Sequence, residues 1–161
     1  MDLSEDKVAE LAEPPHSIVQ AKIDDRGRLK LPSESLEWCR KSSVVNVFVT
    51  AFDKETVRIY PISVWKSTVK KMEAPGDDAD AMADLLTVAR SWGRDAEIDA
   101  QGRIVIHSEL RAELALGSEP VSVEHLKGRI DFRKKSIHDG VLRKAEENLG
   151  AKNAIARKLG L

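Results

Sequence analysis

The sequence predicts an α+β fold made of two tandem β-α-β-β units with flanking helices. Three observations lead to this prediction. A motif of the form Asp-x-x-Gly-Arg, followed by alternating apolar residues, begins at Asp24 and again 75 positions later at Asp99. Each motif precedes a short helical pattern and then two apolar, strand-like runs. With 161 residues, 42% of them hydrophobic, the chain can also bury a core without a disulfide or metal.

Each motif predicts the tip of a β-hairpin. The carboxylates of Asp24 and Asp99 can accept hydrogen bonds from backbone amides in the turn, and Gly27 and Gly102 can adopt the positive φ that closes it. Polar and apolar residues alternate after each glycine, which is typical of a strand with one buried face. We therefore expect these four residues to have structural roles in the turns.

The other elements and the domain boundaries follow from periodicity and composition. Ser33 and Ser108 occupy candidate N-cap positions for helices expected over 34–40 and 109–116. Strands are expected over 44–52, 57–60, 121–125 and 129–132, and further helices over 63–73, 80–92, 141–149 and 153–159. The predicted organisation is a mobile acidic tail (1–16), a first unit with its trailing helix (17–76), a linking helix with the second unit (77–135), and a C-terminal helical segment (136–161).

The charge is balanced in total but segregated along the chain. There are 26 Lys and Arg residues against 27 Asp and Glu, a net charge of -1, which on its face argues against a nucleic-acid partner. Residues 1–13, however, hold five acids and one base, whereas residues 127–161 hold ten bases and four acids. Separated regions of opposite sign can matter more to binding than the total.

The cysteine content and the N-terminus indicate a compartment. The single cysteine, Cys39, cannot form an internal disulfide, and its helical position favours a place in the core over a role as a nucleophile. No apolar run approaches the length of a membrane span, and the acidic first residues are unlike a signal peptide. We therefore expect a cytoplasmic protein that is neither secreted nor embedded in a membrane.

Taken together, these motifs resemble the MraZ family of bacterial transcriptional regulators, which belongs to the SpoVT/AbrB-like swapped-hairpin superfamily. The resemblance rests on residues 23–32, 59–65 and 98–116, and it covers roughly residues 17–135. It implies tandem AbrB-like swapped-hairpin units forming a small β-barrel, and a homo-oligomeric ring. The implied partner is double-stranded DNA at direct repeats in the promoter of a division and cell-wall gene cluster, with the protein associated with the nucleoid. His107 and Arg133 stand where the family usually has proline and an aromatic residue.

The candidate DNA-binding residues lie on the outward faces of the two hairpins. They are Lys22, Arg26, Arg28 and Lys30 in the first copy and Arg103 in the second. The positions that correspond to the first, second and fourth of these cations hold Glu97, Gln101 and Val105, so the second copy loses three of the four charges. We expect the first copy to make the main contact, with Arg28 and Arg26 pairing with guanine or phosphate, and Arg103 to pair structurally with Asp99. The alternative is a solvated outer face of twisted strands.

Other functional classes find less support in the sequence. The four histidines lack metal-ligand spacing and no glycine loop could cradle a phosphate, so we expect no catalytic residue, metal, cofactor or small-molecule substrate. An AbrB-like antitoxin or protein-interaction module stays open, because the acidic tail could dock on a basic partner. The basic residues of 127–161 either supplement the hairpin tips or form a solvated face, and residues 153–161 are interpreted as an amphipathic helix with a possible role in assembly.

Overall fold

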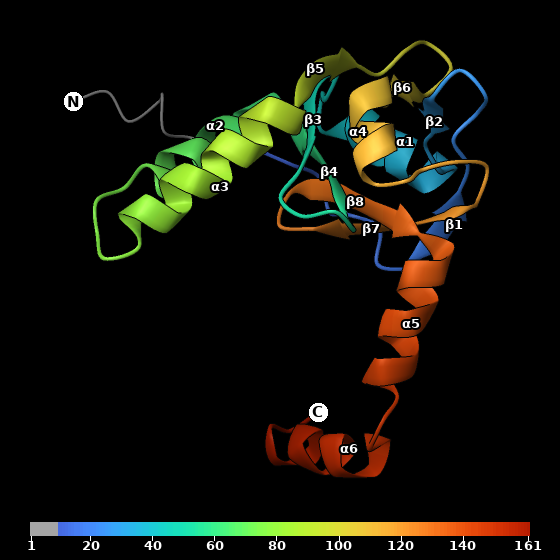
Figure 1. The fold of residues 1–161 in the computed structure, drawn as a ribbon. Helices are drawn as coiled ribbons and strands as arrows, with labels where there is room; N and C mark the ends of the chain where they lie inside the picture. Colours follow the sequence, from blue (N-terminus) through green and yellow to red (C-terminus); the bar gives the residue numbers. More distant parts are fainter. Residues whose placement is uncertain (1–9) are drawn as a thin grey trace.

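The computed structural model describes residues 10–161, which form a mixed α+β fold with antiparallel sheets (Figure 1). The first nine residues of the expected acidic tail lie outside the described residues. The strands are β1 Val19–Ala21, β2 Arg28–Lys30, β3 Asn46–Ala51, β4 Val57–Pro61, β5 Arg94–Glu97, β6 Arg103–Val105, β7 Val121–Leu126 and β8 Arg129–Lys134. The helices are α1 Ser33–Lys41, α2 Ile62–Met72, α3 Ala79–Trp92, α4 Ser108–Glu113, α5 Lys135–Ala145 and α6 Leu149–Lys158. The expected α+β class is confirmed.

The strands form two sheets. The larger sheet has the order β1-β7-β8-β4-β3-β5, and the smaller is the antiparallel pair β2-β6. In residues 10–161 the larger sheet is open, with β1 and β5 as its edges, so the strands do not close into one barrel. The physical reason is that the chain leaves the larger sheet after each edge strand and forms the separate pair β2-β6.

The first strand of each expected unit pairs with a strand of the other unit. Strand β1 lies beside β7, and β5 lies beside β3. At the centre of the arrangement, Arg58 of β4 lies opposite Asp131 of β8, and Leu29 of β2 lies opposite Ile104 of β6. Followed inward from either edge, the larger sheet therefore contains the first strand of one unit and then the third and fourth strands of the other unit. Neither half of the chain completes its part of the sheet alone.

The core fills the space between the two sheets, α1 and α4. Leu29 and Ile104 from β2 and β6 are fully buried there, together with Leu110 of α4 and Phe132 of β8. Cys39 of α1 lies in the same core, which confirms its predicted packing role. Burial raises the pKa of the Cys39 thiol to about 11, so this sulfur stays a protonated, apolar packing group at neutral pH.

The N-caps of α1 and α4 differ from prediction. The helices begin at Ser33 and Ser108, so these serines are the first helical residues, and the N-caps are Pro32 and His107. The Nε2 of His107 lies 2.6 Å from the carbonyl oxygen of Trp92, which can only accept, so Nε2 carries the proton. Its Nδ1 then accepts a hydrogen bond of 3.3 Å from the backbone amide three residues further on. The imidazole of His107 thus caps α4 in place of the expected hydroxyl.

The helices that follow β4 and β8 are placed differently. Helices α2 and α3 form a hairpin against β3, where the hydroxyl of Thr50 donates to the carbonyl of Ala89 at 2.6 Å (Figure 1). Helix α5 projects away from the sheets, and α6 turns off at its far end (Figure 1).

The break between α5 and α6 falls directly before α6 at Asn148, which has a φ of 57°, and not at Gly150 as predicted. Because Gly150 has helical neighbours on both sides, it is tolerated inside α6. None of the helices that the structure describes is long and apolar enough to cross a membrane.

Candidate nucleic-acid interface

The candidate interface is the outer ribbon, which we define as β2, β6 and the turns 24–27 and 99–102. Lys30 lies opposite Arg103, and Arg28 lies opposite Val105. Alternation along each strand turns these four side chains away from the core, because the residues between them are buried. The structure therefore brings three of the candidate cations, Arg28, Lys30 and Arg103, onto one face.

The turn at Asp24 is closed by its own side chain and by glycine. Asp24 Oδ1 accepts hydrogen bonds of 2.9 Å from the backbone amides of Arg26 and Arg28, and Gly27 has a φ of 76°. The amide of Arg28 contributes most to lowering the pKa of the Asp24 carboxyl. The turn at Asp99 has the same arrangement, with the pKa of its carboxyl lowered in the same way. Both turns are rigid elements on which side chains can be presented.

The arginines that follow the two turns are held alike. Arg28 Nε donates to Asp24 Oδ2 at 2.8 Å, and Arg103 Nε donates to Asp99 Oδ2 at 2.9 Å. The Arg28 and Arg103 side chains are 26% and 28% exposed. The structural pairing expected for Arg103 is thus present, and Arg28 has the same pairing. What distinguishes the two turns is therefore the residues around these arginines.

The remaining first-copy cations are more exposed. The Nζ of Lys30 donates to the carbonyl of Gln101 at 2.6 Å, so its ammonium group lies against the second turn. The backbone carbonyl of Lys22 accepts from the amide of Lys30 at 3.3 Å, which places these two residues side by side. Arg26 is at the tip of the first turn and is exposed. On the other strand Val105, which lies opposite Arg28, is 55% exposed and uncharged, so the first strand presents two cations on this face and the second strand presents one, Arg103.

A further cation lies beside the first turn and was missed in the sequence. The side chain of Arg111 in α4 packs against Gly27, and its Nε donates to the carbonyl of Ile106 at 2.8 Å. The side chain of Leu36 in α1 lies against Gly102 in the same way. Leu36 and Arg111 are themselves 75 positions apart, which is the offset between the two motifs. An alignment of the two copies therefore places Arg111 at the position of Leu36. The first turn is thus supported by a base where the second is supported by an apolar side chain.

The described residues also show what the site does not contain. Between residues 10 and 161, no three His, Cys, Asp or Glu side chains are grouped so that they could hold a metal ion. The fold and the ribbon together define a mixed α+β protein that presents basic side chains on a short, rigid β-ribbon.

Comparisons with known proteins identify the family. The chain is similar to the transcriptional regulator MraZ of Koribacter versatilis, with 30% identity over 122 residues that cover 68% of this chain and 83% of the relative. It is 30% identical to the MraZ regulator of Nitrosomonas europaea and 32% identical to that of Thermomicrobium roseum, in each case over 63% of this chain and more than two thirds of the relative. No protein-family model matches the sequence. The chain belongs to the MraZ family, which confirms the resemblance found in the sequence.

Proposed function

We propose that this chain is a sequence-specific DNA-binding transcriptional regulator. In this proposal it binds direct repeats in a promoter as a ring of identical subunits, controls a division and cell-wall gene cluster, and is located in the cytoplasm at the nucleoid. Membership of a family whose named relatives are transcriptional regulators supports the regulatory role. The observation that carries the DNA contact is the outer ribbon, which places Arg28, Lys30 and Arg103 on one face.

The proposed fold is a pair of tandem AbrB-like swapped-hairpin units. It is supported by the pairing of β1 with β7 and of β5 with β3, in which the first strand of each unit joins the other unit. Because β2 and β6 then pair at the centre, both turns lie on the same ribbon. This arrangement explains why two motifs far apart in the sequence can form one surface.

In the proposed contact, the ribbon enters the major groove of DNA. A two-stranded ribbon fits this groove, and guanidinium groups can pair bidentately with guanine. Asp24 accepts a hydrogen bond from the Nε of Arg28, which pre-positions the Nη groups of this arginine. The side chain therefore loses less conformational entropy when it binds DNA. Arg26 at the tip is the second candidate for base or phosphate contact, and Lys22 and Lys30 attract phosphates.

One ribbon has too few cations for tight binding at physiological salt. Non-specific affinity falls steeply as the salt concentration rises. Because this affinity comes from the phosphate contacts, a ribbon with few cations binds weakly at physiological salt. A ring that presents many ribbons to repeated DNA elements raises the affinity through effective concentration. Lys134 and Lys135, in the basic segment that follows Leu126, supplement this contact within the same proposal.

The test compares matched positions of the two turns by fluorescence anisotropy on DNA upstream of the protein's own gene. We expect Arg26→Ala to weaken specific binding about tenfold or more, because a bidentate contact contributes about 1–3 kcal/mol, and Gln101→Ala to have little effect. Arg28→Ala should cost more than Arg103→Ala, although both break the same type of ion pair. Thermal melting of all four variants separates loss of contact from loss of fold.

Two results would contradict the proposal. Equal losses within both matched pairs would refute the unequal roles of the two turns. A wild-type protein that binds no promoter DNA specifically, and instead recovers a stoichiometric protein partner, would favour the antitoxin or interaction-module alternative.

A further inference from the structure

Helices α5 and α6 have an apolar face that the rest of the described chain does not cover. The exposed large apolar side chains on it are Val141, Leu142, Leu149, Ile155 and Leu159, which are between 41% and 72% exposed. Residues 149–161 also contain three bases, Lys152, Arg157 and Lys158, and no acid. An isolated helix with an uncovered apolar face and a uniform charge is typical of an interaction surface.

The sheet under α5 lacks the aromatic surface on which α2 packs. In the first half, the cross-strand neighbours Phe48 and Tyr60 lie under Trp65 of α2, with ring centroids 4.6 and 5.0 Å from it. The corresponding neighbours in β7 and β8 are Ser122 and Arg133. Helix α5 therefore lacks the aromatic surface that α2 binds, and it projects away from the sheets, with α6 at its far end (Figure 1).

The end of α3 shows where such a helix can bind. Helix α3 joins the first half of the chain to the second, and the carbonyl of its last residue, Trp92, is hydrogen bonded to His107 at the start of α4. Directly after it, Arg94 pairs with Glu109 of α4 at 3.0 Å. The end of α3, the helix that follows the first half of the chain, is thus attached to the first turn of α4 in the second half.

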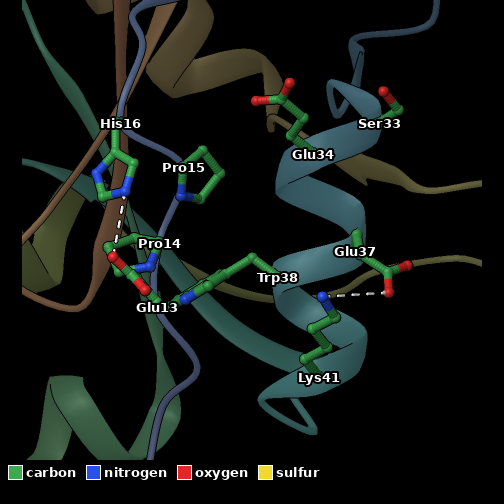
Figure 2. A pocket seen from close by; sticks show the side chains of 9 residues that line it. All are labelled: Glu13, Pro14, Pro15, His16, Ser33, Glu34, Glu37, Trp38 and Lys41. Atoms are coloured by element: carbon green, nitrogen blue, oxygen red, sulfur yellow. Dashed lines mark ion pairs between the residues drawn. The ribbon is translucent and has the colours of Figure 1, made fainter.

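The corresponding place beside α1 is an open groove. Residues 13–16 precede β1 as an extended segment instead of a helix, and a groove of about 590 Å³ lies between this segment and α1 (Figure 2). Glu34 on its wall occupies the position in α1 that Glu109 occupies in α4, 75 residues later. Glu34 is exposed and has no ion pair among the described residues, whereas Glu109 is paired.

The groove is complementary in charge to α6. Its charged lining consists of Glu13, Glu34 and Glu37 against Lys41, with His16 at the edge. Figure 2 shows Glu13 beside His16, at 3.2 Å, and Glu37 beside Lys41, at 3.9 Å. These are exposed pairs that a competing cation can replace at small cost. An acidic groove and a basic helix on different parts of one chain attract each other between chains.

We propose that α6 of a second copy of this chain binds in the groove between residues 13–16 and α1. This inference rests on the proposed ring and names the contact that builds it. Arg157 and Lys158 of one copy reach Glu34 and Glu37 of the next, and Ile155 packs against the proline segment of the groove. The groove and α6 are different surfaces, so the contact is heterologous, and its repetition gives a ring when the rotation closes.

The test is a charge exchange in the full-length chain, followed by molar mass in solution. Glu34→Lys with Glu37→Lys reverses the groove, and Arg157→Glu with Lys158→Glu reverses the helix. We expect either pair to shift the wild-type oligomer toward the 17.9 kDa monomer, and all four substitutions together to restore the oligomer. The matched control, Glu55→Lys with Glu73→Lys, makes the same charge change at exposed sites elsewhere and should leave the oligomer intact.

A second variant tests the apolar part of the contact. Ile155→Ser is an exposed substitution that leaves the fold intact, and it should also shift the mass toward the monomer. The inference is overturned if the charge-reversed proteins keep the wild-type mass, if the fourfold variant stays dissociated, or if the wild type is a monomer. Promoter binding is measured separately on the same proteins. Assembly that follows the charge exchange without any promoter binding would support this contact and contradict the proposed function.

Discussion

Acidification should destabilise the fold through a single partly buried histidine. His125 of β7 lies edge-on to the Trp38 ring, at 5.0 Å between centroids, and its Nε2 is 2.8 Å from the hydroxyl of Ser35. The Nδ1 of His125 is buried and has no hydrogen-bond partner among the described residues. Burial lowers the pKa of His125 from 6.5 to about 4. The folded protein therefore holds this imidazole in its neutral form.

The sign and size of the effect follow from that difference in pKa. The unfolded chain takes up the proton near pH 6.5, and the folded chain only near pH 4. The stability contributed by the neutral ring is present above pH 6.5 and is lost as the pH falls toward 4. Linkage gives a loss of about 2 kcal/mol between pH 7 and pH 5 and about 3 kcal/mol by pH 4.

The assay is urea unfolding of the wild type and of His125→Gln at several pH values from 7 to 4. Glutamine can still hydrogen bond to Ser35 but does not titrate in this range. The other three histidines are present in both proteins, so the difference between the two pH profiles isolates His125. Parallel loss of stability in the two proteins would refute the reasoning.

Two further predictions concern a close contact at a glycine and a buried ion pair. Gly93→Ala should lower the free energy of unfolding by about 2 kcal/mol or more, because the new methyl group would lie 2.1 Å from the Phe48 ring, whereas Gly117→Ala has open space and should change little; denaturant unfolding of both measures this. Arg129→Met should cost about 3 kcal/mol, because it leaves the buried Asp131 carboxylate without its 2.8 Å partner. Adding Asp131→Leu should recover part of that loss, and a double variant less stable than the single one would contradict the argument.

Local features of the fold could be predicted because the forces that produce them act over a few residues. The turns at Asp24 and Asp99 are closed by hydrogen bonds to residues two and four positions away. The burial of Leu29 and Ile104 follows from simple alternation. For the same reason the strands and most helices were located to within a few residues.

Long-range features were not predictable from local pattern. The pairing of β1 with β7 joins residues about a hundred positions apart, and no local propensity specifies such a partner. The equal pairing of Arg28 and Arg103 also required the geometry, because a difference in neighbouring charges had suggested a difference in role. Arg133 is unusual for the family, but its effect on α5 depends on its position opposite Ser122 in the sheet, which no local pattern specifies.

The exchange of first strands between the two halves has a consequence for folding during synthesis. Strand β1 emerges early from the ribosome, yet its partner around Val121–Val123 is made about a hundred residues later. At about 5–20 residues per second, β1 waits on the order of 5–20 s with its edge unpaired. The hairpin β3-β4 can form during this interval, since its strands are adjacent in the sequence. Two nascent chains held close together could therefore exchange β1 with each other, and chain concentration during synthesis would decide whether the pairing is made within one chain or between two.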